Sequence, residues 1–131
     1  MVTKISVDTT DKIRFFKRRF RSFGYGEGHY VLACHAAFPI ALTPDLLYQL
    51  WANFRTFSRR GQTQSISELA VSDLLLSNLC REVSREVFEM DVEVRAYLLE
   101  ALKEDERFGE ERMQLLGSFL YQYMQEVGIT L

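Results

Sequence analysis

Hydrophobic residues recur at helical spacing along most of the chain. Ile13, Phe16, Phe20 and Phe23 lie three, four and three residues apart, so they form one apolar stripe on a helix over about 10–23. The same periodicity predicts five further helices, over about 27–37, 43–54, 65–83, 91–102 and 110–127.

Residues typical of helix starts support two of these boundaries. Thr43 is suited to an N-cap, Pro44 to the first helical position, and Asp45 to the positive end of the helix. Ser65 and Glu68 have the spacing of a capping box, which predicts that the fourth helix begins there.

The expected fold class is all-α, a compact single-domain bundle of about six helices around one core. A chain of 131 residues has the length of one domain. Residues 1–9 are expected to form an N-terminal arm. A cap at Thr10 or Asp11 then opens a helical interaction domain over 10–131. The polar stretch 58–65 is interpreted as a loop, and the fourth helix can extend to Phe88. The packing order of the helices does not follow from the pattern.

The composition is that of a globular protein, with 47% hydrophobic and 26% charged residues. The formal net charge of −2 predicts no general attraction to nucleic acid or acidic membranes. Apolar runs are far shorter than the roughly 20 residues that a membrane-spanning helix needs. The N-terminal sequence lacks the apolar core of a secretory signal. We therefore expect a cytoplasmic protein that does not associate with membranes.

The neighbouring Cys34 and His35 raise the question of a reactive pair. On a helix their side chains point about 100° apart, whereas a nucleophilic dyad needs thiol and imidazole to face each other. His29 lies about 240° around the same helix from His35, so the two histidines share no metal-binding face. Cys34 and Cys80 belong to no C-x-x-C pair and are expected to be buried. The sequence predicts no catalytic residue, metal site or cofactor. A nucleophilic Cys34 or Cys80 is the third of three functional hypotheses.

Glu82, Glu86 and Glu89 would share one face if the fourth helix extends that far. Carboxylates at this spacing can bind metals in helical bundles, but the di-metal motif requires a Glu followed by a His three residues on, which is missing here. Arg81 and Arg85 interleave with these acids at ion-pair spacing. We interpret the group as a solvated charged face.

The apolar stretch from His35 to Phe54 is interpreted as a packing joint between the second and third helices. It contains the only tryptophan and both prolines of the chain. A structural role is expected for His35, Phe38, Pro44, Tyr48, Trp51 and Phe54. This interpretation leaves the charged exterior to contact other molecules.

Two charged groups are the candidate binding surfaces. The basic group consists of Lys17, Arg18 and Arg21. The acidic group consists of Glu100, Glu104, Asp105 and Glu106. Complementary charges can orient the docking of proteins, although ordinary solvated surface explains both groups equally well. The run KRRFR over 17–21 also raises nucleic-acid binding. Its phenylalanine falls on the stripe expected to be buried, so nucleic acid is the less favoured partner.

The segments HAAFPIALTPDLLY and VSDLLLSNLCREV…EMDVEVRAYLL resemble a helical, effector-associated module of large bacterial, often cyanobacterial, multidomain proteins. In those proteins the module lies beside STAND-type NTPase, WD40, caspase-like or formylglycine-generating-enzyme-like domains. The resemblance covers roughly residues 20–127. It implies a non-catalytic domain attached to effectors and sensors, and it supplies no catalytic residues. Whether the chain stands alone or is one domain of a longer protein does not follow from the sequence.

The leading hypothesis is therefore a non-catalytic adaptor module in bacterial signalling or defence. It would bind protein partners by docking helix faces, either by homotypic self-association or with a multidomain sensor or effector. The alternative is a nucleic-acid-binding regulator that uses the basic first helix.

Overall fold

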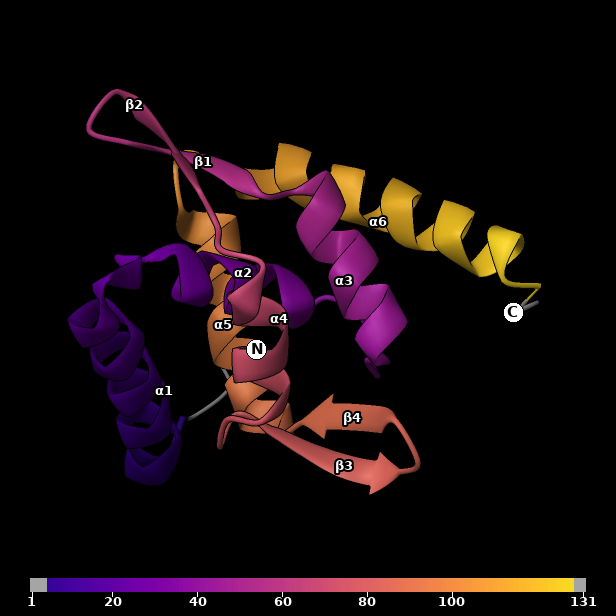
Figure 1. Ribbon diagram of the computed structural model, residues 1–131, viewed down its shortest axis with the longest axis horizontal. Helices are drawn as coiled ribbons and strands as arrows, with labels where there is room; N and C mark the ends of the chain where they lie inside the picture. Colours follow the sequence, from indigo (N-terminus) through magenta and orange to yellow (C-terminus); the bar gives the residue numbers. More distant parts are fainter. Residues whose placement is uncertain (1–4, 129–131) are drawn as a thin grey trace.

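Two β-hairpins accompany six α-helices in the computed structural model, which describes residues 5–128 (Figure 1). The helices are α1 (Val7–Phe20), α2 (Gly28–Ala36), α3 (Pro44–Asn53), α4 (Leu69–Leu75), α5 (Val92–Glu104) and α6 (Gly109–Glu126). A π-helical turn, η1 (Arg21–Tyr25), extends α1. The strands are β1 (Thr56–Arg59), β2 (Gln62–Ser65), β3 (Cys80–Ser84) and β4 (Val87–Met90). The predicted all-α class is therefore wrong, and the fold is mixed α/β.

The first hairpin occupies the polar stretch that the sequence predicts as a loop. Strands β1 and β2 pair antiparallel, and Arg60 and Gly61 connect them. These two residues have φ angles of 51° and 77°. Positive φ at both central residues is the geometry that matches the right-handed twist of hairpin strands. Six polar strand residues, two from β1 and four from β2, and a two-residue turn thus replace the expected loop.

The predicted capping box is also wrong, because Ser65 is the last residue of β2. Helix α4 begins four residues later, at Leu69. The Ser67 hydroxyl accepts a hydrogen bond from the Leu69 N–H at 3.2 Å and so satisfies one free donor at this helix end.

Ser77 ends the fourth helix well before the predicted limit. Its hydroxyl donates to the Leu74 carbonyl at 2.7 Å and accepts from the Leu79 N–H at 3.2 Å. Serine hydroxyls that bond nearby backbone in this way compete with helix continuation. The chain then folds back as β3 and β4, so the predicted helix over 65–83 and its extension to Phe88 are wrong. Leu42 pairs with Phe88 through two backbone hydrogen bonds of 2.8 Å, which joins this hairpin to the segment before α3.

Helix α2 lies at the centre, with α1 on one side and α3 on the other (Figure 1). Eight of its nine residues are buried, as its small apolar side chains predict. At Gly28 the helix packs close to the segment that follows β2, since an added Cβ would be in van der Waals contact, 3.4 Å from the backbone of Ile66. Each of the other helices contributes to the same core. Their most buried members include Phe16, Leu47, Leu74, Leu98 and Leu116.

The expected joint between α2 and α3 is built from aromatic contacts. Thr43 caps α3 by accepting from the Leu46 N–H at 3.1 Å, with Pro44 in the first position, as predicted. Trp51 is 8% exposed, and its indole N–H donates to the Ile66 carbonyl at 2.8 Å. This hydrogen bond ties α3 to the segment that follows β2.

The remaining residues expected to be structural occupy different depths. His35 is buried, Phe38 and Phe54 are half-buried, and Tyr48 is 42% exposed with its ring 5.5 Å from that of Trp51. Phe54 packs between His35 and Phe119, with ring separations of 5.6 and 5.7 Å. The joint therefore extends from α2 through α3 to α6.

Candidate interaction site

Helix α1 carries the predicted basic group, and its buried stripe sets the direction of the group. Ile13, Phe16 and Phe20 are at most 7% exposed. Phe23, the fourth predicted member of the stripe, is instead 62% exposed. It lies in η1, where the wider π-helical turn and the φ of 90° at Gly24 move side chains out of the α-helical phase. The expectation that this phenylalanine is buried is therefore wrong.

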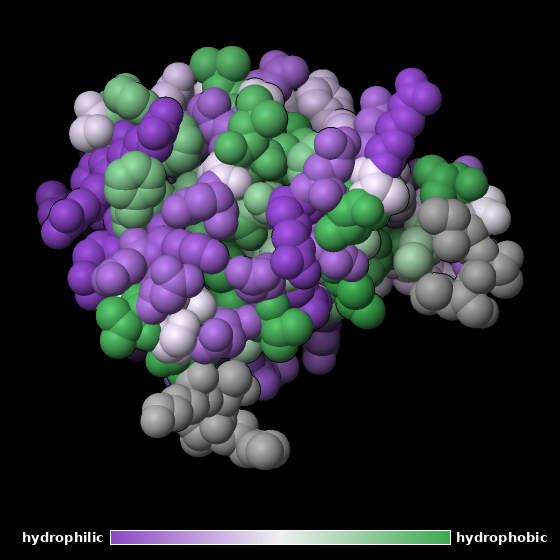
Figure 2. All heavy atoms as spheres, turned by 90° about the horizontal axis from the view of Figure 1, so that it is seen from below, coloured by the Kyte–Doolittle hydropathy of each residue, from purple (hydrophilic) through white to green (hydrophobic). Residues whose placement is uncertain are grey.

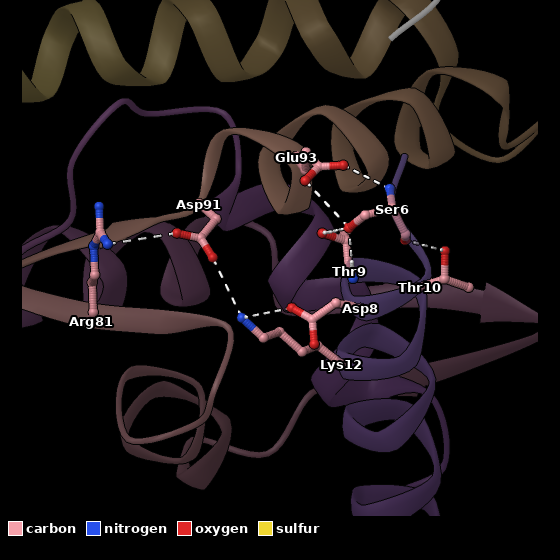
Figure 3. Close-up of polar contacts among 8 residues, drawn as sticks. All are labelled: Ser6, Asp8, Thr9, Thr10, Lys12, Arg81, Asp91 and Glu93. Carbon is pink, nitrogen blue, oxygen red and sulfur yellow. Dashed lines mark hydrogen bonds and ion pairs between the residues drawn. The ribbon is translucent and has the colours of Figure 1, made fainter. Parts of the chain in front are cut away.

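A polar network fastens the N-terminal end of α1 to the start of α5 (Figure 3). Ser6, which is the N-cap in place of the predicted Thr10 or Asp11, donates its backbone N–H to Glu93 Oε1 at 2.7 Å. Lys12 Nζ lies 3.5 Å from a carboxylate oxygen of Asp91. The polar and charged groups at this end of α1 are therefore paired with groups of the same chain.

The basic group lies further along α1, beside a shallow groove between α1 and α5. We call this the basic groove. It has a volume of about 260 Å³ and is lined by Thr10, Ile13, Arg14, Lys17, Arg18, Arg21 and Tyr97. Spacings of three and four place its cations on one flank of the helix.

The cations of the basic groove differ in whether they have a partner. Arg14 lies 3.4 Å from Asp11. Within residues 5–128, Lys17, Arg18 and Arg21 have no carboxylate within 4.0 Å. The Lys17 ammonium instead lies over a tyrosine ring, 4.3 Å from its centroid. The groove thus presents positive charge that this part of the chain does not neutralise by contact.

Three members of the predicted acidic group are exposed on the last turn of α5 and the link to α6. Glu100, Glu104 and Glu106 form no ion pair with any other residue in the described range. The structure does not bring these acids into contact with the basic group. Both groups therefore present unpaired charge of opposite sign on the same chain.

Asp105, the fourth member, has a different role. Its carboxylate accepts hydrogen bonds from Nε, Nη2 and the backbone N–H of Arg107, at 3.0, 2.8 and 2.9 Å. This guanidinium holds the pKa of Asp105 below its usual value. Arg107 also donates to Glu27 Oε1 at 2.8 Å and to the Ser58 carbonyl at 2.7 Å. Asp105 therefore belongs to an internal clasp that joins the α5–α6 corner to α2 and β1.

A second groove lies on the opposite flank of α1, against the turn that follows α4. We call this the aromatic groove. It has a volume of about 550 Å³ and is lined by Phe15, Phe16, Arg19, Phe20, Phe23, Tyr25, Asp73, Leu76, Ser77 and Asn78. Phe15, Phe23 and Leu76 stand on it with exposures of 55%, 62% and 83%. The Arg19 guanidinium lies 5.6 Å from the centroid of the Phe23 ring.

Sequence reasoning missed this groove because it predicted one long helix over 65–83. Leu76 falls inside that predicted helix, but in the structure it lies just beyond the end of α4. Phe15 is adjacent to Phe16 and therefore cannot share the buried stripe. Phe15, a large apolar residue outside the buried stripe, is therefore the feature of the sequence that could have indicated an exposed apolar surface here. Figure 2 shows one face of the molecule, on which hydrophobic residues lie scattered among hydrophilic ones.

A buried histidine supports the aromatic groove from below. His29 is 1% exposed, and its ring stacks on Phe20 with centroids 4.3 Å apart. A carboxylate can only accept, so the His29 Nε2–H donates to Asp73 Oδ2 at 2.9 Å. His29 Nδ1 has no hydrogen-bond partner within the described residues. The histidine thus fixes both Asp73 and Phe20, which line the groove.

Neither ring nitrogen of His35 is hydrogen-bonded to a thiol among the described residues. Burial raises the pKa of both Cys34 and Cys80 to about 12, so the thiolate is disfavoured. His35 Nδ1 lies 2.7 Å from the Val31 carbonyl, and Nε2 lies 3.0 Å from Arg112 Nη1. Both ring nitrogens are therefore engaged by groups other than Cys34.

The three glutamates that were considered as metal ligands lie on a hairpin. Glu82 and Glu89 belong to β3 and β4, and Glu86 lies in the turn between them with a φ of 59°. The conditional prediction of a shared helical face is therefore wrong. Glu82 Oε2 accepts a hydrogen bond from the Glu86 N–H at 2.9 Å. Over residues 5–128, no three His, Cys, Asp or Glu side chains converge as a metal site would require.

Among the helices of the described range, none combines the length and apolar character needed to cross a bilayer.

Comparison with protein-family models, curated proteins and solved structures finds no match to this chain. The resemblance to an effector-associated module stays a prediction.

Proposed function

We propose that this chain is a non-catalytic protein–protein interaction module, an adaptor of bacterial signalling or defence systems that acts in the cytoplasm. It self-associates by docking the basic groove of one copy against the acidic residues Glu100, Glu104 and Glu106 of another. The resemblance described above favours the adaptor role, and the charges of the surface favour this mode of docking.

The proposal depends on one observation. Lys17, Arg18 and Arg21 lie together on one flank of α1 and lack carboxylate partners within the described residues, as several arginines elsewhere in this range also do. Five other cations of this range have such partners. Lys12 and Arg107, for example, are each placed against acids. Unpaired cations and unpaired acids at separate places on one chain allow two copies to complement each other.

The strength of such docking depends on copy number. Exposed ion pairs contribute at most about 1 kcal/mol each, so a single docking event is weak. Linking several copies raises the effective concentration and converts a weak contact into a stable assembly. An adaptor of this kind would remain monomeric when dilute and assemble when a sensor gathers it.

Paired charge reversals test the proposal. The variant R18E/R21E makes both surfaces acidic, and E100K/E104K makes both basic. We expect wild-type protein to self-associate at low salt in analytical ultracentrifugation, and each variant alone to remain monomeric. An equimolar mixture of the two variants should associate again, because every contact then pairs opposite charges.

Two results would overturn this proposal. One is a wild-type protein that stays monomeric at every concentration, and the other is a mixture that associates no better than the separate variants. Circular dichroism of each variant provides the control for folding.

The nucleic-acid alternative gains one observation from the structure. Phe15 and Phe23 are exposed beside arginines, and exposed aromatic rings can stack on unpaired bases. It predicts that a labelled single-stranded oligonucleotide binds wild-type protein but not R18E/R21E, with an affinity that falls as salt rises. A gel-shift assay at low salt distinguishes this outcome from self-association.

A further inference from the structure

The aromatic groove is an apolar surface that the described part of the chain leaves uncovered. Phe16 and Phe20 form its floor, both at most 7% exposed. Phe15, Phe23 and Leu76 form its rim, all at least 55% exposed. Leucine and phenylalanine side chains gain about 1.5–3 kcal/mol each when they are fully buried. Three such side chains around one groove favour a partner that covers them.

The charge around the groove indicates the chemistry of that partner. Arg19 lies between the Phe20 and Phe23 rings and has no carboxylate within 4.0 Å in the described range. Asp73 is the one acid in the lining, and His29 already donates to it. The lining therefore carries one cation and one anion, and of the two only the Arg19 guanidinium has no hydrogen-bond or ion-pair partner among the described residues.

A helix in the groove would place one or two bulky residues against the phenylalanine floor, as amphipathic helices do in apolar grooves. Its acidic residues would then lie near Arg19, where a carboxylate forms charge-assisted hydrogen bonds with a guanidinium.

We infer that the aromatic groove binds an acidic amphipathic segment of a partner protein through a bulky apolar anchor. This inference rests on the proposed adaptor function, because an adaptor needs a second surface for its client. The two flanks of α1 then bind different partners. The basic groove joins copies of the module, and the aromatic groove holds the client.

A displayed library of helix-forming peptides tests the inference. The library is selected on wild-type protein and counter-selected on the double variant F23S/L76S. We expect the enriched peptides to carry Leu, Phe or Trp next to Asp or Glu. Their affinity should fall at least about tenfold on F23S/L76S, as is usual when central apolar contacts are removed.

Two further variants complete the design. V92S is the matched control, because Val92 is 79% exposed but lies away from the groove, at the start of α5. Peptide affinity should be unchanged in V92S. The variant R19E should weaken acidic peptides and leave the apolar preference in place. Because Phe23 and Leu76 are exposed, F23S/L76S should keep the wild-type circular dichroism spectrum.

Several outcomes would overturn the inference. They are a selection that enriches no peptide, peptides that bind F23S/L76S as well as wild type, and enriched peptides that are basic. A labelled oligothymidine that binds wild type and is lost on F23S/L76S would assign the groove to nucleic acid instead. Self-association provides the separate readout. If F23S/L76S associates like wild type while no peptide binds, the groove inference fails and the proposed docking function stands.

Discussion

The buried His35 and the half-buried Arg112 form a hydrogen bond that fixes the tautomer of the histidine. The Arg112 guanidinium can only donate, so His35 Nε2, 3.0 Å away, must accept. The proton of the neutral ring therefore sits on Nδ1, which donates to the Val31 carbonyl at 2.7 Å. The ring of Phe108 packs edge-on against the imidazole, with centroids 5.1 Å apart. One side chain thus joins α2 to the start of α6 only while it is neutral.

This arrangement predicts that acid destabilises the protein. Burial, with a smaller contribution from Arg112, lowers the pKa of His35 from its ordinary 6.5 to about 4. Between these values the unfolded state binds a proton that the folded state does not, so stability falls as the pH falls through this window. The loss reaches at most about 3 kcal/mol at pH 4 and is absent above pH 7. Urea denaturation across this range measures it.

The variant H35Q is the matched control, because glutamine stays neutral throughout. It should be less stable than wild type at pH 7, and its stability should vary less between pH 6.5 and pH 4. An equally steep dependence in H35Q would assign the effect to other groups. Asp105 acts in a lower range, because Arg107 depresses its pKa: its stabilisation is present above the ordinary pKa of 3.8 and is lost as the pH falls from there through the depressed pKa.

The spacing of apolar residues predicts a helix reliably only where other residues mark the ends of that helix. Helices α2 and α3 were predicted well because a glycine, a proline and a capping threonine mark their ends. The region after α4 was predicted badly. Leu75, Leu76, Leu79, Cys80 and Val83 keep helical spacing although the chain has already turned at Ser77. The Ser77 hydroxyl makes two hydrogen bonds to nearby backbone that favour the end of the helix. The spacing of apolar residues contains no information about these bonds.

The candidate site shows the same limit. The basic group could be read from the sequence because charges on one helix flank follow from spacing alone. Asp105 could not be separated from its acidic neighbours, because its role depends on an arginine that also reaches Glu27 and Ser58 across the fold. The aromatic groove depends on the position of Leu76 next to α1, which is a tertiary contact.

A second prediction concerns the clasp at Arg107. Its guanidinium donates to two carboxylates and one carbonyl. Lysine keeps the charge but cannot reproduce this fork, so R107K should lower the free energy of unfolding by about 1–2 kcal/mol. The Arg107 side chain is 30% exposed, and screening by solvent therefore limits the expected loss of stability. Arg85 lies exposed in the turn after β3, and R85K should change stability by less than about 0.5 kcal/mol. Equal effects of the two variants would contradict the clasp.

A third prediction uses two glycines in opposite conformations. Gly61 has a φ of 77° in the β1–β2 turn, so G61A should destabilise the protein by about 1 kcal/mol through backbone strain. Gly117 lies inside α6, and a Cβ there would meet Phe38 at an ordinary 3.9 Å. G117A should therefore stabilise the protein by about 0.5–1 kcal/mol. Thermal unfolding of both variants checks the direction of each change in stability. A G61A variant as stable as wild type would argue against the hairpin turn.

The last prediction tests the hypothesis of a nucleophilic cysteine. With a pKa of about 12, each thiol in the folded protein is ionised in only about one molecule in ten thousand at pH 8. Cys34 is also 4% exposed, which denies a reagent access. A mild aromatic disulfide reagent should therefore leave Cys34 unlabelled in native protein and label both thiols quickly in urea. The single variants C34S and C80S assign the signal to each position. Rapid labelling of Cys34 in the folded protein would contradict the burial of that thiol and make a catalytic role the hypothesis to pursue, because only an accessible thiolate can attack a substrate.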